Sequence, residues 1–258
     1  MILFFFIFLL SSFFLGYPYS ETSEAILSIK NITNTIDTNS TISIDEDFVF
    51  NDTIKNALSS FNSNNYENAI IWYNKAIIIK PLSIEAINGK GLSLSELGKQ
   101  KEAIELYDRA LKIDPNSKQV LNNKGYSLDE VGKHLEAIEL YDRALKIDPN
   151  SKQVLNNKGY SLYLQGKYQL AIELYDKALK IDPKFVDALA NKGSAFYRMG
   201  QYTKALEWLD KALKIDPAIL ASIYYKTRSL EELGKTQLAA EYFKNASNIY
   251  YHTIINKP

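Results

Sequence analysis

Cysteine is absent from the sequence, and histidine is nearly so, with His134 and His252 as its only two examples. The first absence excludes disulfides, thiolate metal sites, cysteine nucleophiles and a lipid anchor attached through cysteine. The two histidines lie far apart and form neither a His-Glu-x-x-His pattern nor any other pair at metal-ligand spacing. Stability must therefore come from packing, and we expect no metal or cofactor.

The sequence also lacks net charge, because 30 basic residues balance 30 acidic ones. Such a balance provides no global field to attract nucleic acid or anionic lipid. The eleven glycines are spread along the chain and form no phosphate-binding loop. Neighbouring carboxylates such as Asp129 and Glu130 are expected on exposed helix faces, where nothing would separate their pKa values. We therefore predict that the protein is not an enzyme and has no nucleic-acid partner.

No charged residue occurs before Glu21, and residues 2–15 are apolar except for two serines. A helix of that length spans roughly 21 Å, whereas the hydrocarbon core of a bilayer is about 30 Å thick. The length fits the apolar region of a secretory signal peptide, although no basic residue precedes it and no A-x-A pattern follows it. The alternative is an uncleaved membrane anchor that reaches Tyr19. Residues 1–19 are thus a signal peptide or a tether, and we expect an exported protein, secreted or anchored at the outer face of the membrane.

Residues 20–49 are rich in Ser, Thr, Asn and Ile and show no sustained helical period, which predicts a flexible stalk. Acceptor patterns for N-glycosylation begin at Asn31, Asn39, Asn51 and Asn245. A chain so rich in these residue types also produces such tripeptides by chance.

A period of 34 residues governs the rest of the chain. The string EAIELYDRALKIDPNSKQVLNNKGYSL occurs identically at 102–128 and 136–162, which indicates internal duplication. Prolines recur at the same interval, at Pro81, Pro115, Pro149, Pro183 and Pro217. Each period contains two amphipathic segments, which predicts a helix–turn–helix unit closed by the proline.

Glycine marks the turn inside each unit, because it tolerates the left-handed conformation that ends a helix. The turn column is Asn64, Gly98, Gly132, Gly166, Gly200 and Gly234. In the second segment two alanine columns flank a bulky one, which consists of Tyr73, Tyr107, Tyr141, Tyr175, Leu209 and Phe243. We expect these bulky side chains to fill the space between repeats.

This pattern resembles the tetratricopeptide repeat family, whose motif has a small residue in the first helix, two alanines around an aromatic residue in the second, and a closing proline. The resemblance implies an all-α, right-handed α-solenoid of about six repeats over residues 50–258. The repeats would span residues 50–83, 84–117, 118–151, 152–185, 186–219 and 220–253. In such solenoids the first helices line a concave groove.

By the family's pattern, the groove should carry amides that bond a peptide backbone and tyrosines that provide contact area. The residues at these places are Asn122, Asn123, Tyr126, Asn156, Asn157, Tyr160, Tyr163, Asn191, Tyr197, Arg198 and Arg228. One subgroup of the family grips a partner's terminal carboxylate with a Lys, Asn, Asn, Lys, Arg set, and this chain lacks that set. The resemblance therefore implies a non-enzymatic scaffold that binds a protein or peptide partner of unknown identity.

Charged residues on the second helices are spaced four apart, as in Glu105 with Arg109, Glu207 with Lys211, and Asp108 with Lys112. We interpret them as local pairs on a solvated face. The sequence leaves two functions open. One is a peptide-binding module that uses the groove, and the other is a membrane-tethered assembly factor that uses the convex surface or the helix ends.

Overall fold

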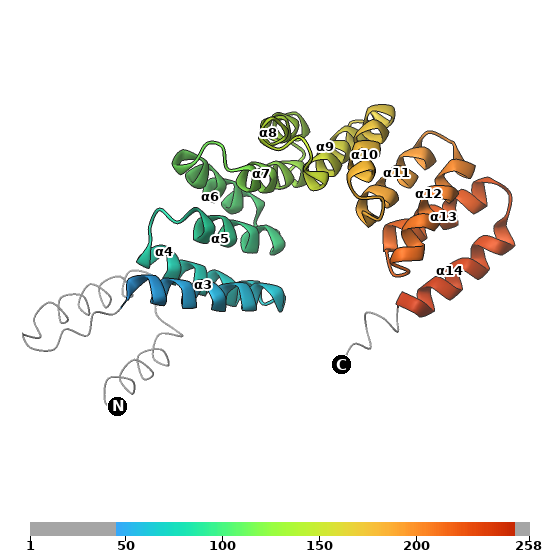
Figure 1. Ribbon diagram of the computed structural model, residues 1–258. Coiled ribbons are helices and arrows are strands. Elements are labelled where there is room, and N and C mark those ends of the chain that lie inside the picture. Colours follow the sequence, from blue (N-terminus) through green and yellow to red (C-terminus); the bar gives the residue numbers. More distant parts are fainter. Residues whose placement is uncertain (1–44, 251–258) are drawn as a thin grey trace, which may run out of the picture. The chain divides into compact units, whose positions relative to one another are not determined.

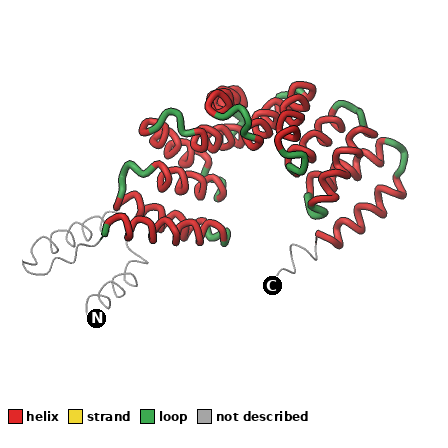
Figure 2. The backbone as a smooth tube through the Cα atoms, in the orientation of Figure 1, coloured by secondary structure: helices red, strands yellow, loops and turns green. Residues whose placement is uncertain are grey.

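The computed structural model describes residues 45–250, which are helical and contain no strand (Figures 1 and 2). The chain divides into two compact units, Met1–Asp45 and Glu46–Pro258, and every helix described below belongs to the second. The predicted signal or anchor segment, residues 1–19, and most of the predicted stalk lie outside the described residues. No helix in the described range is both long and apolar enough to span a membrane. The prediction of an all-α fold is confirmed.

Between residues 46 and 250 the chain forms six helix–turn–helix repeats. The first helices are α3 (Glu46–Asn62), α5 (Ile84–Glu96), α7 (Lys118–Glu130), α9 (Lys152–Leu164), α11 (Val186–Arg198) and α13 (Leu220–Glu232). The second helices are α4 (Tyr66–Ile79), α6 (Gln100–Ile113), α8 (His134–Ile147), α10 (Tyr168–Ile181), α12 (Tyr202–Ile215) and α14 (Thr236–Tyr250). From α5 onward each first helix starts where its predicted repeat starts. The first helix instead begins at Glu46, four residues before the predicted start at residue 50.

The turn inside each repeat has the conformation that the glycine column predicts. Gly132 has φ +79°, and the other four turn glycines are also in the left-handed region. Asn64 takes the same conformation with φ 58°, which asparagine adopts more readily than most residues. The backbone N–H after each turn then bonds back into the first helix, as from Lys133 to the carbonyl of Leu128 at 2.8 Å. This bonding satisfies carbonyl groups that the helix end leaves open.

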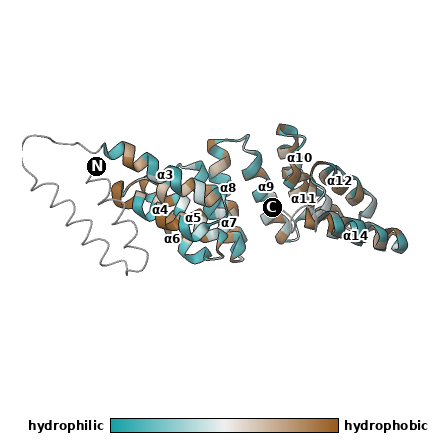
Figure 3. Ribbon diagram, turned by 90° about the horizontal axis from the view of Figure 1, so that it is seen from below, coloured by the Kyte–Doolittle hydropathy of each residue, from teal (hydrophilic) through white to brown (hydrophobic). Residues whose placement is uncertain are grey.

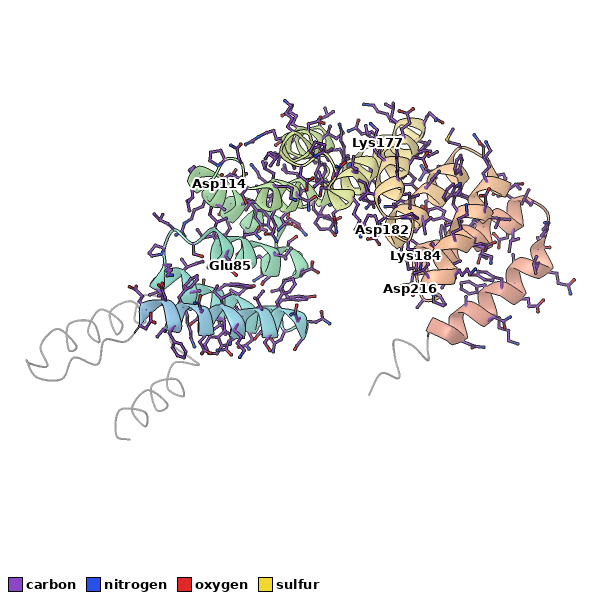
Figure 4. The ribbon with its side chains drawn as sticks, viewed as in Figure 1. Glu85, Asp114, Lys177, Asp182, Lys184 and Asp216 are labelled. Carbon is purple, nitrogen blue, oxygen red and sulfur yellow. The ribbon has the colours of Figure 1, made fainter. Side chains whose placement is uncertain are left out.

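From the second repeat onward, the links between repeats are closed by an aspartate that precedes the proline, whereas Lys80 precedes Pro81 in the first link. The Asp182 side chain accepts a hydrogen bond from the backbone N–H of Lys184 at 2.9 Å, and Asp114 and Asp216 make the equivalent bond (Figure 4). A short polar side chain that bonds the backbone two residues ahead favours a turn over a further helical turn. The Asp-Pro pair therefore ends the second helix through both its side chain and its ring.

The bulky column of the second helices fills space between repeats, as expected, and also inside each repeat. Tyr73 of α4 packs against Gly89 of α5 in the next repeat, where an added Cβ would lie 2.3 Å from the ring. Tyr141 of α8 is fully buried against Gly125 of α7, where an added Cβ would lie 2.6 Å from the ring. The same pairing recurs in the neighbouring repeats, between Gly91 and Tyr107 and between Gly159 and Tyr175. The small residue of the first helix therefore leaves room for the ring.

The first helices also contact one another from repeat to repeat, whereas within the described range the second helices do not. The helices thus converge on the side of the first helices, which makes that side the concave face of the solenoid. Brown and teal residues alternate along the helices in Figure 3, as expected for helices with one buried and one solvated side.

The ion pairs of the second helices mostly join neighbouring repeats, so the prediction of local pairs is largely wrong. Asp108 pairs with Lys124 of the next first helix at 2.5 Å rather than with Lys112. Equivalent pairs are Asp142 with Lys158, Asp176 with Lys192, and Asp210 with Lys226. Arg109 donates to the carbonyl of Pro81 at 2.6 Å rather than pairing with Glu105. Lys211 does pair with Glu207 at 2.8 Å, as predicted.

Candidate functional site

All eleven predicted groove residues lie on first helices of the central and C-terminal repeats, on α7, α9, α11 and α13. Their exposure differs. Tyr126, Arg198 and Arg228 are exposed, whereas Asn156 and Tyr163 are buried. The other six are half-buried: Asn122, Asn123, Asn157, Tyr160, Asn191 and Tyr197. The structure thus separates residues that can touch a partner from residues that support the face.

The asparagines bond to one another across neighbouring first helices. Asn157 donates from Nδ2 to Oδ1 of Asn122 at 3.0 Å, and Asn191 makes the same bond to Asn156. A third bond joins Asn123 to Asn88, which the sequence did not single out. Each bond spans 35 residues in the chain. A side-chain amide has two N–H groups and an oxygen with two lone pairs, so each asparagine keeps part of its hydrogen-bonding capacity.

A hollow of about 440 Å³ opens on this face between α7, α9, α11 and the start of α13. Five predicted residues line it together: Tyr126, Asn156, Asn157, Tyr160 and Asn191. The rest of its wall is Asp129, Glu130, Tyr141, Asp187, Ala190, Ile219, Leu220 and Ala221. The hollow therefore combines tyrosine rings, amides and three carboxylates from consecutive repeats. The remaining six predicted residues do not line it.

Asp129 is the clearest departure from the sequence interpretation, because its carboxylate is buried rather than on an exposed helix face. It accepts hydrogen bonds from the Tyr141 hydroxyl at 3.0 Å and from the Ser161 hydroxyl at 2.5 Å. The Nδ1 atom of His134 lies 2.9 Å from its other oxygen. Burial and the adjacent Asp129 charge both raise the pKa of Tyr141, so this hydroxyl keeps its proton and donates.

The same place in the next repeat holds Tyr163, at the first residue beyond the duplicated string. Tyr163 packs on Tyr168 with ring centroids 5.4 Å apart, just as Asp129 meets His134 five residues later. Ser95 with Gln100, and Tyr197 with Tyr202, meet across their turns in the same way. The two residues that flank each of these turns thus form a compatible pair, either polar or aromatic. A spacing of five residues in the sequence predicts such a contact.

Tyr163 belongs to a tyrosine cluster and is not an exposed ligand contact. Its hydroxyl lies 2.9 Å from that of Tyr225, and its ring stacks on Tyr160 at 6.0 Å. Burial is the main cause of its raised pKa, and the bond to Tyr225 adds to it. Arg198 lies over the Tyr163 ring at 5.8 Å. Tyr197 of α11 also packs on Tyr225 of α13, with ring centroids 5.2 Å apart. Tyr163 and Tyr197 thus join the C-terminal repeats to one another.

A second hollow, of about 550 Å³, lies on the N-terminal first helices, where the sequence interpretation placed no site residue. Leu58, Phe61 and Leu92 line it, together with Glu85 of α5, which Figure 4 labels.

Comparisons with known proteins agree with this architecture. Three family descriptions match: "TPR repeat" over residues 159–200, "Tetratricopeptide repeat" over 186–218, and "Psidin, N-terminal TPR repeats region" over 54–162. No curated protein matches the sequence.

Solved structures are similar over most of the chain. PilW, a widely conserved type IV pilus biogenesis factor, has a TM-score of 0.70 and 22% identity, and the match covers 81% of this chain and 95% of that one. PilF of Pseudomonas aeruginosa has a TM-score of 0.67 and 23% identity with the same coverage. YrrB, a TPR protein with an unusual peptide-binding site, has a TM-score of 0.52 and 25% identity over 67% of this chain and 90% of that one. The family models thus identify tetratricopeptide repeats within residues 54–218, and the solved structures share the fold.

Proposed function

We propose that this protein binds an extended segment of a partner protein on the face of its first helices, in the hollow between α7 and α13. The observation that carries the proposal is that hollow, in which side chains from four consecutive repeats meet. Tetratricopeptide repeats support a role in protein interaction, and YrrB is a TPR protein with a peptide-binding site.

The chemistry of the hollow suits an extended backbone. The amides of Asn157 and Asn191 are held in place by bonds to the preceding repeat and retain groups that can bond a peptide N–H or C=O. The exposed Tyr126 ring offers apolar area and a hydroxyl at low entropic cost. A volume of about 440 Å³ is within the range of ligand-binding clefts. Pre-ordered amides reduce the entropy lost when a partner binds.

The test is a selection of random peptides on the immobilised full chain in mild detergent, followed by affinity measurements with labelled selected peptides. Tyr126→Ala should weaken binding by at least about fivefold, because it removes an aromatic contact from the hollow. The matched control is Leu170→Ala, which removes an exposed apolar side chain from the second helix α10. Circular dichroism should show equal helicity for both variants.

Two outcomes would contradict groove binding. In one, no peptide is retained. In the other, Tyr126→Ala binds as tightly as the control variant. The second outcome would favour the alternative, a tethered assembly factor that uses the second helices or the ends of the solenoid.

We also propose that the protein is exported, on the basis of the apolar run at residues 2–15, which lies outside the described residues. Mass spectrometry of the protein from its source cells would identify its first residue. A new terminus near Ser20 would indicate a cleaved signal peptide, and an intact terminus with membrane association would indicate an anchor.

A further inference from the structure

Two carboxylates of the central hollow differ from the aspartates that recur on the second helices. Asp108, Asp142, Asp176 and Asp210 each pair with a lysine of the next repeat. Glu130 and Asp187, by contrast, line the hollow and form no ion pair with any residue of the described range. No lysine or arginine belongs to the wall of the hollow. Four outer aspartates are thus paired with lysines, whereas Glu130 and Asp187 line a hollow that has no basic residue in its wall.

Asp129 adds a third negative charge at the base of the hollow, although its own oxygens are occupied by hydrogen bonds. The negative charge also acts on a neighbouring ring. The pKa of Tyr160 is raised mainly by burial, and the Glu130 carboxylate raises it further. Burial also raises the pKa of Asp187, so the charged form of this group is poorly hydrated. A cation bound in the hollow would offset the Glu130 charge near Tyr160 and would stabilise the charged form of Asp187.

We infer that the hollow receives a lysine or arginine side chain of the bound segment, with Glu130 and Asp187 as its charge partners. This inference rests on the proposed function and specifies the chemistry of the partner. Tyr126 and Tyr160 line the hollow from two neighbouring repeats, and a cation placed over the face of such a ring gains electrostatic stabilisation. An arginine would also match a carboxylate through its planar fork.

Other side chains fit less well. An acidic residue would meet three carboxylates and be repelled. An apolar residue would displace water from Glu130 and Asp187 without replacing the lost hydration. Only a basic side chain would form ion pairs with the unpaired carboxylates of the hollow.

The peptide selection described above supplies the first test, because the residue composition of the selected peptides is measured. We expect enrichment of lysine and arginine in peptides whose binding Tyr126→Ala weakens. Binding of such a peptide should weaken by about fivefold in Glu130→Gln and in Asp187→Asn, and should also weaken as sodium chloride is raised. Replacing the peptide's arginine by citrulline, which keeps the shape and removes the charge, should have a similar effect.

The matched control is Glu173→Gln on the second helix α10, which makes the same change in net charge away from the hollow and should alter affinity less than about twofold. Selected peptides without basic enrichment, or variants Glu130→Gln and Asp187→Asn that behave like the control, would overturn the inference while groove binding stands. Failure to select any peptide sensitive to Tyr126→Ala would instead overturn the proposed function, and this inference with it.

Discussion

Replacing Tyr141 or Tyr175 by phenylalanine makes the same chemical change at two equivalent places with different surroundings. Both rings are fully buried, and each lies against a glycine of its own first helix. The Tyr141 hydroxyl donates to the buried Asp129 carboxylate at 3.0 Å. The Tyr175 hydroxyl has no hydrogen-bond partner among the described residues. The two variants should therefore differ in the free energy of unfolding.

The expected magnitudes follow from these contacts. A hydrogen bond to a charged group contributes about 1.5–3 kcal/mol, so Tyr141→Phe should destabilise the protein by about 2 kcal/mol. Asp129 keeps its bonds to Ser161 and His134, which limits the loss. A buried hydroxyl without a partner is itself unfavourable, so Tyr175→Phe should change stability by less than about 0.5 kcal/mol or increase it.

Urea unfolding followed by circular dichroism would measure both variants at pH 7. Repeat proteins can unfold in parts, so the slope of each transition must first be compared with that of the wild type. Hydrogen exchange in α8 and α10 would locate the change. Equal destabilisation by the two substitutions would refute the assignment of the Asp129 bond as the source of the difference.

Three further predictions concern the repeat framework. Gly125→Ala should destabilise the protein by about 1–2 kcal/mol in urea unfolding, because the new Cβ would lie 2.6 Å from the Tyr141 ring and the gain in helix propensity offsets only part of that strain. Asp182→Asn keeps a side-chain acceptor for the turn but loses the ion pair with Lys152. The Lys152 hydrogen bond lowers the pKa of Asp182 from 3.8, so the folded state binds fewer protons than the unfolded one. The variant should thus be less stable than the wild type above about pH 4, and the difference should shrink as the pH falls below that value. Asn157→Ala removes one side-chain hydrogen bond between repeats and should lower the free energy of unfolding by about 1 kcal/mol. Unchanged stability would show that this hydrogen bond contributes nothing.

Much of the framework could be predicted from the sequence because its signals are local or strictly periodic. The turn glycines have the expected left-handed conformation, and from α5 onward each first helix starts at the first residue of its expected repeat. The boundary at the amino-terminal end was less accurate, since α3 begins at Glu46 in a region where the proline and alanine signals have not yet started. The groove was predicted as a face, and five of its eleven residues line one hollow.

The side-chain partners were harder to predict because they depend on distances between helices. A local pair on a solvated helix contributes only about 0.2–0.5 kcal/mol, so Asp108 can exchange Lys112 for Lys124, whose side chain is 18% exposed. The hydrogen bond between Asn157 and Asn122 spans 35 residues, and the composition of neither helix predicts it.

The sequence by itself determined the period, the helix pairs and their turns, because backbone preferences and apolar spacing act over a few residues. Only the tertiary structure decided the environment of each polar group. Asp129 follows a string identical to the one that precedes Tyr163, yet it is buried because Tyr141 and Ser161 approach it from neighbouring helices. The distance between packed helices determines whether such a group keeps its water or finds a partner, and that distance follows from the packing of all the repeats together.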